Sequence, residues 1–292
     1  MPKDGVVALF PGQGDVHMGK DGWHRHPIVQ EIFRDASDIA GRPIPAPSDL
    51  APESPQVERQ LSLMAASLGR WEMIRQEGVS IVAAGGISLG EYAAAVATGA
   101  LSRADGFRAV WARGRCMDRY ARAGDMLAVL GLDTDNLRQA LQDVTADAYI
   151  ACIYGPRHHL VSGTDSALPQ VRLRLSQPGI RVVSVPTGIP SHCPLMAAVV
   201  PCLYRAFKAL DWRPLSIPWL SGVDGQATRR VVTVRERLVR QTVEPVHWLH
   251  IVHTLRYVHN RVMDIGPGQS VSRLLKNQPG LALIPYRERI MP

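Results

Sequence analysis

The pentapeptide Gly86-Ile87-Ser88-Leu89-Gly90 restricts the fold of this chain more than any other segment. It follows an apolar, partly β-branched run at 79–84 and precedes a helix-like stretch at 91–98. The G-x-S-x-G pattern is that of a strand-to-helix elbow, whose glycines permit a strained backbone that exposes the serine hydroxyl. Because so short a pattern also arises by chance, the prediction depends on the flanking strand and helix. The sequence therefore predicts an α/β domain with Ser88 at the end of a buried strand.

The N-terminal segment has the same strand-to-loop character. Its apolar run at 6–10 stops at Pro11-Gly12-Gln13-Gly14, which is typical of a buried strand followed by a tight loop. Helical periodicity follows at 27–40 and again at 54–77. These segments extend the α/β pattern to the first part of the chain.

The pattern changes to shorter units between about residues 125 and 186. We expect strands at 126–131, 149–154, 159–162 and 180–185, with helices at 133–144 and 165–175. That order, β-α-β-β-α-β, is typical of a split ferredoxin-like unit. We therefore predict a large α/β-hydrolase-like domain with a parallel sheet, formed by residues 1–124 and 187–292, and an inserted ferredoxin-like α+β domain over 125–186.

The cysteines and the N-terminus indicate a cytoplasmic protein. Residues 1–10 lack the long apolar region of a secretory signal, and no stretch reaches the length of a membrane span. The four cysteines are scattered without CxxC spacing, in a chain large enough not to need disulfides. We therefore expect Cys116, Cys152, Cys193 and Cys202 to be reduced thiols.

The chain carries a formal net charge of +7, but its basic residues are spread out and not interleaved with stacking aromatics. This distribution argues against nucleic acid as a partner, whereas an acidic protein or a phosphate-bearing cofactor fits the charge. One stretch is strongly cationic and offers a docking face for an acidic protein, although a solvated helix surface has the same composition. Its arginines are Arg229, Arg230, Arg235, Arg237 and Arg240.

A serine hydroxyl needs a base to become a useful nucleophile, and the intrinsic pKa of histidine suits this role near neutral pH. Of the ten histidines, His192 stands out because it lies in a proline-bounded loop, Pro190-Ser191-His192-Cys193-Pro194. The loop position alone leaves a solvated or capping histidine as an alternative. His247, His250 and His253 recur every third residue, but no cysteine or carboxylate completes a ligand set, so we predict no metal site.

Six motifs together resemble the malonyl-CoA:acyl carrier protein transacylase family in order and approximate spacing, over nearly the whole chain. They are Phe10-Pro11-Gly12-Gln13-Gly14, Gly86-Ile87-Ser88-Leu89-Gly90-Glu91-Tyr92, Arg113-Gly114-Arg115-Cys116-Met117, Pro190-Ser191-His192-Cys193, Gln241 with Pro245-Val246-His247-Trp248, and Gly266-Pro267-Gly268.

The resemblance implies a ping-pong transfer of a malonyl group from malonyl-CoA, through an ester on Ser88, to the phosphopantetheine thiol of an acidic acyl carrier protein. It implies His192 as base and then acid, oriented by a backbone carbonyl near Gln241. It further implies backbone N–H groups of Gln13 and Leu89 as the oxyanion hole, and Arg113 as the clamp for the malonyl carboxylate, which a guanidinium can grip with two parallel hydrogen bonds. We expect a monomer with no tightly bound cofactor.

The sequence departs from the family pattern at three places. Ile87 replaces the histidine that usually precedes the nucleophile, Ile153-Tyr154-Gly155-Pro156 replaces an Asn-Ser-Pro-like turn, and Asp15-Val16 replaces a Ser-Gln pair. These changes leave open whether the pathway is fatty acid synthesis, polyketide synthesis or malonate decarboxylation, and whether methylmalonyl is also a substrate. A thioester hydrolase that edits acyl carriers and an inactive carrier-binding scaffold are the alternative functions.

Overall fold

The computed structural model describes residues 4–14, 22–51, 53–144, 146–276 and 278–286. Its larger sheet has the strand order β11-β10-β1-β2-β7-β8, and all neighbours are parallel except β7 and β8. The strands are β1 (Val6–Phe10), β2 (Ile81–Gly86), β7 (Trp219–Leu220), β8 (Ala227–Thr228), β10 (Arg261–Asp264) and β11 (Ala282–Leu283). A largely parallel sheet confirms the α/β class predicted for the large domain.

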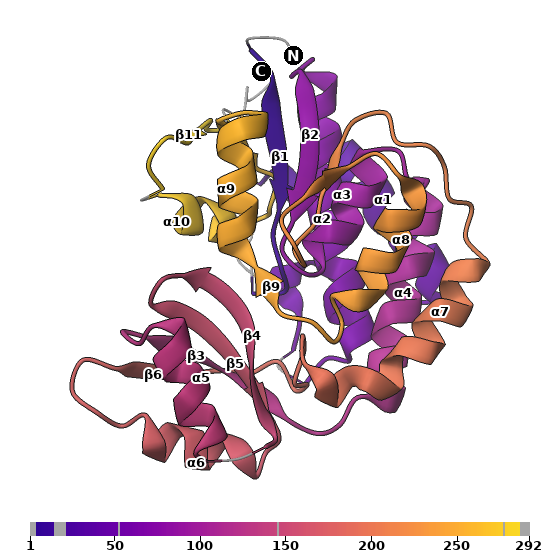
Figure 1. Cartoon of the computed structure of the whole chain (residues 1–292). Coiled ribbons are helices and arrows are strands. Elements are labelled where there is room, and N and C mark those ends of the chain that lie inside the picture. Colours follow the sequence, from indigo (N-terminus) through magenta and orange to yellow (C-terminus); the bar gives the residue numbers. More distant parts are fainter. Residues whose placement is uncertain (1–3, 15–21, 52, 145, 277, 287–292) are drawn as a thin grey trace.

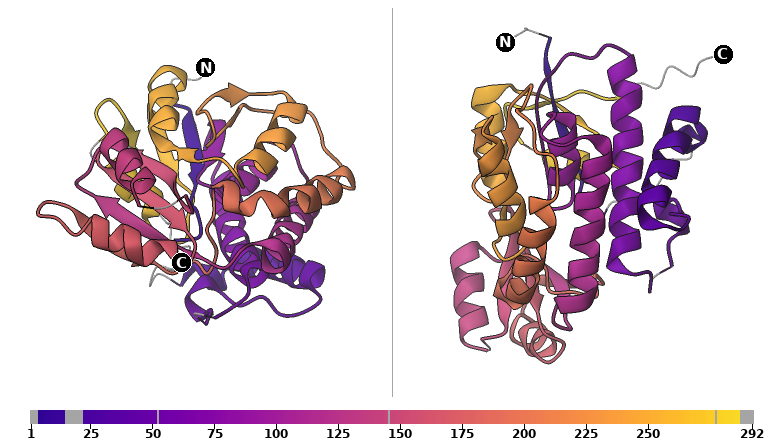
Figure 2. Two further views of the ribbon diagram at one scale, coloured as in Figure 1. Left: turned by 60° about the horizontal axis from the view of Figure 1, so that its bottom comes forward. Right: turned by 90° about the vertical axis from the view of Figure 1, so that its right-hand side faces the viewer.

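Helices cover both faces of this sheet, as Figures 1 and 2 show. Because strand side chains alternate, Val6, Ala8 and Phe10 of β1 enter one apolar core and Val7 and Leu9 enter the other. The first core is shared with α1 (Pro27–Ala40), α2 (Gln56–Gln76), α3 (Gly90–Ala97), α4 (Arg103–Tyr120), α7 (Val200–Lys208) and α8 (Val231–Arg240). The second is shared with α9 (Trp248–Val258) and α10 (Ser270–Leu275).

The described residues also include three short 3-10 helices: η1 (Trp23–Arg25), η2 (Pro47–Asp49) and η3 (Pro194–Val199). No helix in the described part of the chain is both long and apolar enough to cross a membrane.

The turn between β2 and α3 requires both glycines of the elbow. A Cβ atom on Gly86 would lie 2.4 Å from the carbonyl carbon of Gly90, and one on Gly90 would lie 2.2 Å from the carbonyl oxygen of Phe10. Any side chain at either position would therefore clash with backbone. The helix can start directly behind Ser88 only because these two residues have no side chain.

The segment that follows α4 builds a second sheet, seen at the lower left of Figure 1. Its elements are β3 (Asp125–Leu130), α5 (Thr134–Gln142), β4 (Ala148–Gly155), β5 (His158–Gly163), α6 (Ala167–Arg174) and β6 (Arg181–Val185). The order β6-β3-β5-β4 with antiparallel neighbours is ferredoxin-like, and the unit has an apolar core of its own. The domain boundaries at 124/125 and 186/187 stay a prediction.

A fifth strand joins this smaller sheet from a distant part of the chain. β9 (Val246–His247) pairs in parallel with β4, through Cys152 with Val246 and Ile153 with His247. The sequence did not predict this strand, because two residues carry no periodicity. The pairing attaches the ferredoxin-like unit to the segment that leads into α9.

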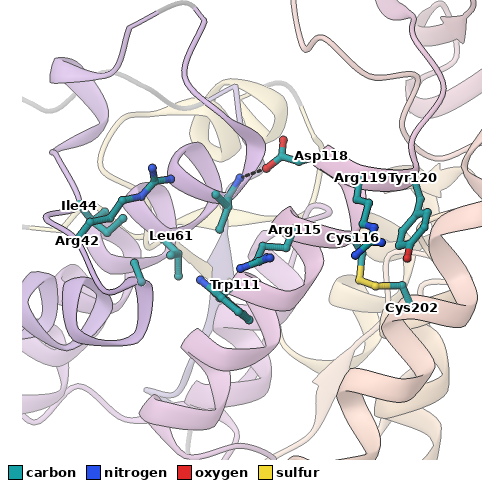
Figure 3. A pocket seen from close by; sticks show the side chains of 12 residues that line it. Arg42, Ile44, Leu61, Trp111, Arg115, Cys116, Asp118, Arg119, Tyr120 and Cys202 are labelled. Atoms are coloured by element: carbon teal, nitrogen blue, oxygen red, sulfur yellow. Dashed lines mark hydrogen bonds between the residues drawn. A yellow bond between two sulfur atoms is a disulfide. The ribbon is translucent and has the colours of Figure 1, made fainter.

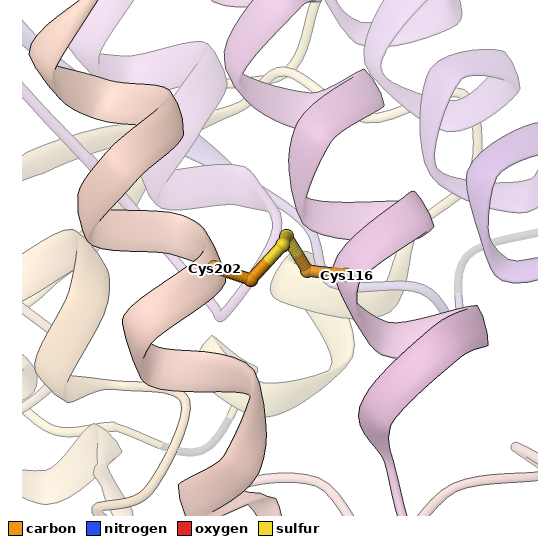
Figure 4. Close-up of a disulfide and its surroundings, with 2 residues drawn as sticks. All are labelled: Cys116 and Cys202. Carbon is orange, nitrogen blue, oxygen red and sulfur yellow. A yellow bond between two sulfur atoms is a disulfide. The ribbon is translucent and has the colours of Figure 1, made fainter.

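The expectation of four reduced cysteines is wrong for two of them. Cys116 of α4 and Cys202 of α7 form a disulfide with their Cα atoms 5.9 Å apart (Figures 3 and 4). The two residues are 86 positions apart in the sequence, so only the packing of α4 against α7 brings them together. Cys152 and Cys193 are free and buried.

Candidate active site

Ser88 and His192, which are 104 positions apart in the sequence, are brought together by the fold. The Nε2 atom of His192 lies 2.8 Å from the Ser88 hydroxyl oxygen, and its Nδ1 atom lies 2.5 Å from the backbone carbonyl of Gln241. Both side chains are buried, with exposed fractions of 8% for Ser88 and 4% for His192. The structure therefore forms a serine–histidine pair, and a backbone carbonyl takes the place that a carboxylate has in a catalytic triad.

The hydrogen bond to Gln241 fixes the tautomer of the histidine. A carbonyl oxygen can only accept, so Nδ1 carries the proton and Nε2 is free to accept from the serine hydroxyl. Burial, and after it the charge of Arg113, lower the pKa of His192 to about 4. The neutral ring, which can act as a base, is therefore the form present at neutral pH.

Both members of the pair have unusual backbone conformations. Ser88 has φ 53° and His192 has φ 62°, and within the described residues these are the two non-glycine residues with positive φ. Such conformations cost free energy and persist where the surroundings enforce them. The elbow glycines leave room for the turn at Ser88, and the bond from the Glu91 N–H to the Ser88 carbonyl, 3.1 Å, holds it. The bond from the His192 N–H to the Thr242 carbonyl, 3.1 Å, holds the backbone at His192.

Arg113 of α4 points at the same serine. Its Nη2 atom donates to Ser88 Oγ at 3.2 Å and its Nη1 atom donates to Gln60 Oε1 at 2.7 Å, while its Nε atom has no partner among the described residues. The guanidinium is fully buried and lies 5.5 Å from the ring centre of Tyr92. A cation with unused donor capacity therefore sits directly beside the nucleophile.

A buried acid of the same motif, Glu91, forms no ion pair with this cation among the described residues. Glu91, three residues after the nucleophile, is fully buried, and burial raises its pKa to about 8 despite the opposing effects of the Gly222 backbone and Arg113. A protonated Glu91 leaves the positive charge of Arg113 without a counter-ion. An incoming carboxylate would supply one.

The pair opens into a pocket of about 1020 Å³ between the large sheet and the ferredoxin-like unit. Its walls come from the loop after β1, the start of α2, the strands β4 to β6 and helix α10, and they include Gln13, Arg59, Tyr154, His158 and Arg273. The backbone N–H groups of Gln13 and Leu89 donate no backbone hydrogen bond within the described residues. Gln13 lines the pocket and Leu89 directly follows the nucleophile, so the assignment of both as oxyanion donors stays a proposal.

Two glutamines of α2 were missed from the sequence. Gln60 accepts from Arg113 and donates from Nε2 to the sulfur of Met117 at 3.2 Å. Gln56 accepts from the Gln13 side chain at 3.0 Å and donates to the Thr187 carbonyl at 2.6 Å. A glutamine on the buried side of a helix needs a polar partner, and this was the available signal.

The departures from the family pattern have local explanations. Ile87 is 4% exposed and packs in one apolar cluster with Val7, Leu9 and Met126. An aliphatic side chain therefore fits where the family usually has histidine, and it adds an apolar surface to the pocket. Tyr154 and Gly155 also line the pocket, whereas Asp15-Val16 lies outside the described residues.

The cationic stretch around α8 does not line this pocket. Arg237 lies 2.5 Å from an Asp224 oxygen and Arg240 lies 2.8 Å from a Glu244 oxygen, so two of its charges are balanced locally. Its role in docking a partner stays a prediction.

The recurring histidines of α9 do not form a ligand set either. The rings of His247 and His250 stack with their centres 4.8 Å apart. In the part of the chain that the structure describes, no three His, Cys, Asp or Glu side chains are placed to hold a metal ion.

Comparison with known proteins gives one family. The family model described as an acyl transferase domain matches residues 48–277. The malonyl CoA-acyl carrier protein transacylase of Salmonella typhimurium is 28% identical over 280 residues, covering 92% of this chain and 91% of the relative. The enzyme of the same name from Bacillus subtilis is 27% identical over 283 residues, covering 93% and 89%.

Solved structures agree with these relatives. The malonyl-CoA:acyl carrier protein transacylase of Xanthomonas oryzae superposes with a TM-score of 0.89 at 30% identity, covering 97% of this chain and 94% of that one. A malonyl-transacylase in complex with its type II PKS acyl-carrier protein gives a TM-score of 0.88 at 26% identity, covering 96% of both chains.

Proposed function

This chain belongs to the acyl transferase domain family, among the malonyl-CoA:acyl carrier protein transacylases, and we propose that it moves a malonyl group from coenzyme A to the phosphopantetheine thiol of an acyl carrier protein. The observation that carries the proposal is a buried guanidinium that donates to the nucleophilic hydroxyl and forms no ion pair among the described residues. This arrangement suits an acyl group that ends in a carboxylate.

In the first half-reaction the Ser88 oxygen attacks the thioester carbonyl while Nε2 of His192 takes the hydroxyl proton. The Gln241 carbonyl orients the ring and stabilises the imidazolium that forms. The N–H groups of Gln13 and Leu89 stabilise the oxyanion, each contributing about 3 kcal/mol in the transition state. The carbon–sulfur bond then breaks, His192 returns the proton to the departing thiolate, and the malonyl ester remains on Ser88.

The second half-reaction repeats these steps with a new thiol. His192 takes the proton of the carrier's phosphopantetheine thiol, the thiolate attacks the ester, and the proton returns to Ser88. Arg113 holds the malonyl carboxylate throughout, which keeps the ester carbonyl in one position for both attacks.

Intact-protein mass spectrometry tests the function directly. Brief incubation with malonyl-CoA should add one malonyl increment, and a phosphopantetheinylated carrier should remove it and become malonylated. Acetyl-CoA, as a control, should label far less. Release of CoA without a lasting label or carrier transfer would instead identify a hydrolase, and no label with no CoA release would identify an inactive scaffold.

The acylation rate should be insensitive to His192 protonation down to an unusually low pH. Because the pKa of His192 is lowered to about 4, its basic form persists until the pH falls through that value, whereas an ordinary histidine would be half-protonated near pH 6.5. We expect kcat/KM for malonyl-CoA to be level from about pH 5.5 to about pH 7, above which Glu91 begins to ionise beside Arg113. Stopped-flow measurement of CoA release at pH 4–8 checks this, and an acid limb centred near 6.5 would contradict it.

Gln60 should position Arg113. Gln60→Met keeps the length of the side chain but removes the carbonyl that accepts from Nη1, which leaves a buried donor unpaired. The cost of about 1–3 kcal/mol predicts a loss of about 5- to 150-fold in malonyl-CoA acylation, with acetyl-CoA acylation little changed. Gln76→Met, an exposed position on the same helix, serves as the matched control. Equal losses with both acyl donors would show a purely structural role.

The remaining features follow from the substrates. The protein needs no tightly bound cofactor, because coenzyme A arrives as the thioester and phosphopantetheine arrives on the carrier. We propose that the reaction takes place in the cytoplasm, but because Cys116 and Cys202 form a disulfide, the cysteines do not support this compartment. The apolar contact of Ile87 beside the nucleophile supports a specialised enzyme, and the pathway stays open between fatty acid synthesis, polyketide synthesis and malonate decarboxylation.

A further inference from the structure

A second cavity lies on the other side of helix α2 from the serine–histidine pair. It has a volume of about 580 Å³ and shares no lining residue with the active-site pocket. Val57 and Leu61 of α2 line this cavity, whereas Arg59 and Leu63 of the same helix line the other one. Its volume lies within the range of small-molecule sites, roughly 300–1,000 Å³.

The cavity is cationic. Of its three arginines, Arg42 pairs with Glu58 at 3.0 Å, but Arg115 and Arg119 form no ion pair among the described residues. The Arg115 guanidinium lies 4.7 Å from the ring centre of Trp111, and that of Arg119 lies 5.3 Å from the ring centre of Tyr120. A guanidinium that lies over an aromatic ring is held by cation–π attraction and keeps N–H groups that can bind an anion.

The rest of the lining consists mainly of apolar side chains at one end of the cavity and a disulfide at the other. Ile44, Leu61 and the ring of Trp111 offer apolar surface between α2 and α4, as Figure 3 shows. At the other end, the disulfide between Cys116 and Cys202 holds α4 against α7 (Figure 4). A ligand for such a cavity therefore needs an anionic group for the arginines and an apolar or aromatic body for the opposite wall.

The one carboxylate in the lining is already engaged. Asp118 accepts from the backbone N–H groups of Gln56 at 2.9 Å and Val57 at 3.3 Å, which caps the start of α2. Its charge is thus directed at the helix start, and the lining keeps a net positive charge. The same Gln56 holds the Gln13 side chain, so a ligand here would lie beside the hydrogen bonds that fix the loop after β1.

We propose that this cavity binds a small organic phosphate that carries an aromatic ring. A phosphate monoester is a dianion that can accept from Arg115 and Arg119 together, one helical turn apart on α4. Its ring would cover the apolar wall of Ile44 and Leu61. The site is independent of the acyl transfer reaction proposed above, because it uses none of the same residues.

Isothermal titration calorimetry with adenosine 5′-monophosphate tests the proposal. Inorganic phosphate probes the arginines alone, and adenosine probes the apolar wall alone. We expect saturable binding at one site, tighter for the nucleotide than for either part alone. The double variant Arg115→Ala/Arg119→Ala should bind the nucleotide about tenfold or more weakly than the unmodified protein does. Arg229→Ala/Arg230→Ala removes two positive charges elsewhere on the surface and should change the affinity less than about twofold.

Three results would overturn the site: no saturable binding to the unmodified protein, binding that survives Arg115→Ala/Arg119→Ala, or an equal loss in Arg229→Ala/Arg230→Ala. Binding that survives Arg115→Ala/Arg119→Ala would indicate a different site, such as the active-site pocket. An equal loss in Arg229→Ala/Arg230→Ala would indicate attraction by the overall positive charge of the protein. Circular dichroism and thermal melting of both double variants confirm that each is folded.

Discussion

Ser88→Ala abolishes covalent loading by malonyl-CoA and lowers the transfer rate by at least about 10⁴-fold. The expectation rests on the 2.8 Å contact between the serine hydroxyl and Nε2 of His192, because no other nucleophile among the described residues of the pocket is hydrogen-bonded to a histidine. The free thiol that lines the same pocket cannot take over, since burial raises the pKa of Cys152 to about 12. His192→Ala should lower the transfer rate by as much, because the Ser88 hydroxyl then has no proton acceptor.

Intact mass after brief incubation with malonyl-CoA measures the loading, and radiolabel transfer to a carrier measures the rate. Ser191→Ala is the matched control: it removes the other buried serine beside the histidine and should keep the malonyl increment. A persistent increment on Ser88→Ala would place the acyl group on another residue, and peptide mapping would locate it.

Arg113→Met reverses the acyl preference of the enzyme. The guanidinium can form two charge-assisted hydrogen bonds with the malonyl carboxylate, together worth about 3 kcal/mol or more, which predicts a loss of at least about 10²-fold in malonyl-CoA acylation. Acetyl-CoA has no carboxylate, so its acylation should stay the same or rise once the buried cation is gone. Methionine fills a similar volume in the fully buried site.

The ratio of kcat/KM for the two donors is the measurement, because it cancels any general loss of active protein. Arg108→Met is the matched control on α4, where the arginine is exposed and pairs with Asp105. An equal fall for both donors in Arg113→Met would show that the guanidinium supports the fold of the site and does not select the acyl group.

The sequence predicted the parts of the site that depend on local backbone. The elbow is one such part, because two glycines around a serine after a β-branched run permit few other structures, and the structure shows β2, the turn and α3 there. The ferredoxin-like order of the inserted unit was another, since its strands and helices are separated by short turns. The contact of His192 with Ser88 rested on a family resemblance, because a loop histidine gives no periodic signal.

What could not be predicted depends on contacts between distant segments. The Cys116–Cys202 disulfide requires α4 and α7 to pack together, and the role of Gln60 requires α2 to face α4. The lowered pKa of His192 depends on burial that only the assembled fold produces. Each of these is a property of tertiary packing and leaves no mark in a short sequence window.

The pairing of β9 with β4 limits how freely the inserted unit can be exchanged. The segment that supplies the last strand of the ferredoxin-like sheet begins five residues after Gln241, whose carbonyl orients the catalytic histidine. A chimera that takes residues 125–186 from a homologue would thus receive a foreign edge strand beside Val246 and His247. Grafts meant to alter carrier choice should therefore transplant residues 241–247 together with the insert, because β9 and β4 pair in one sheet.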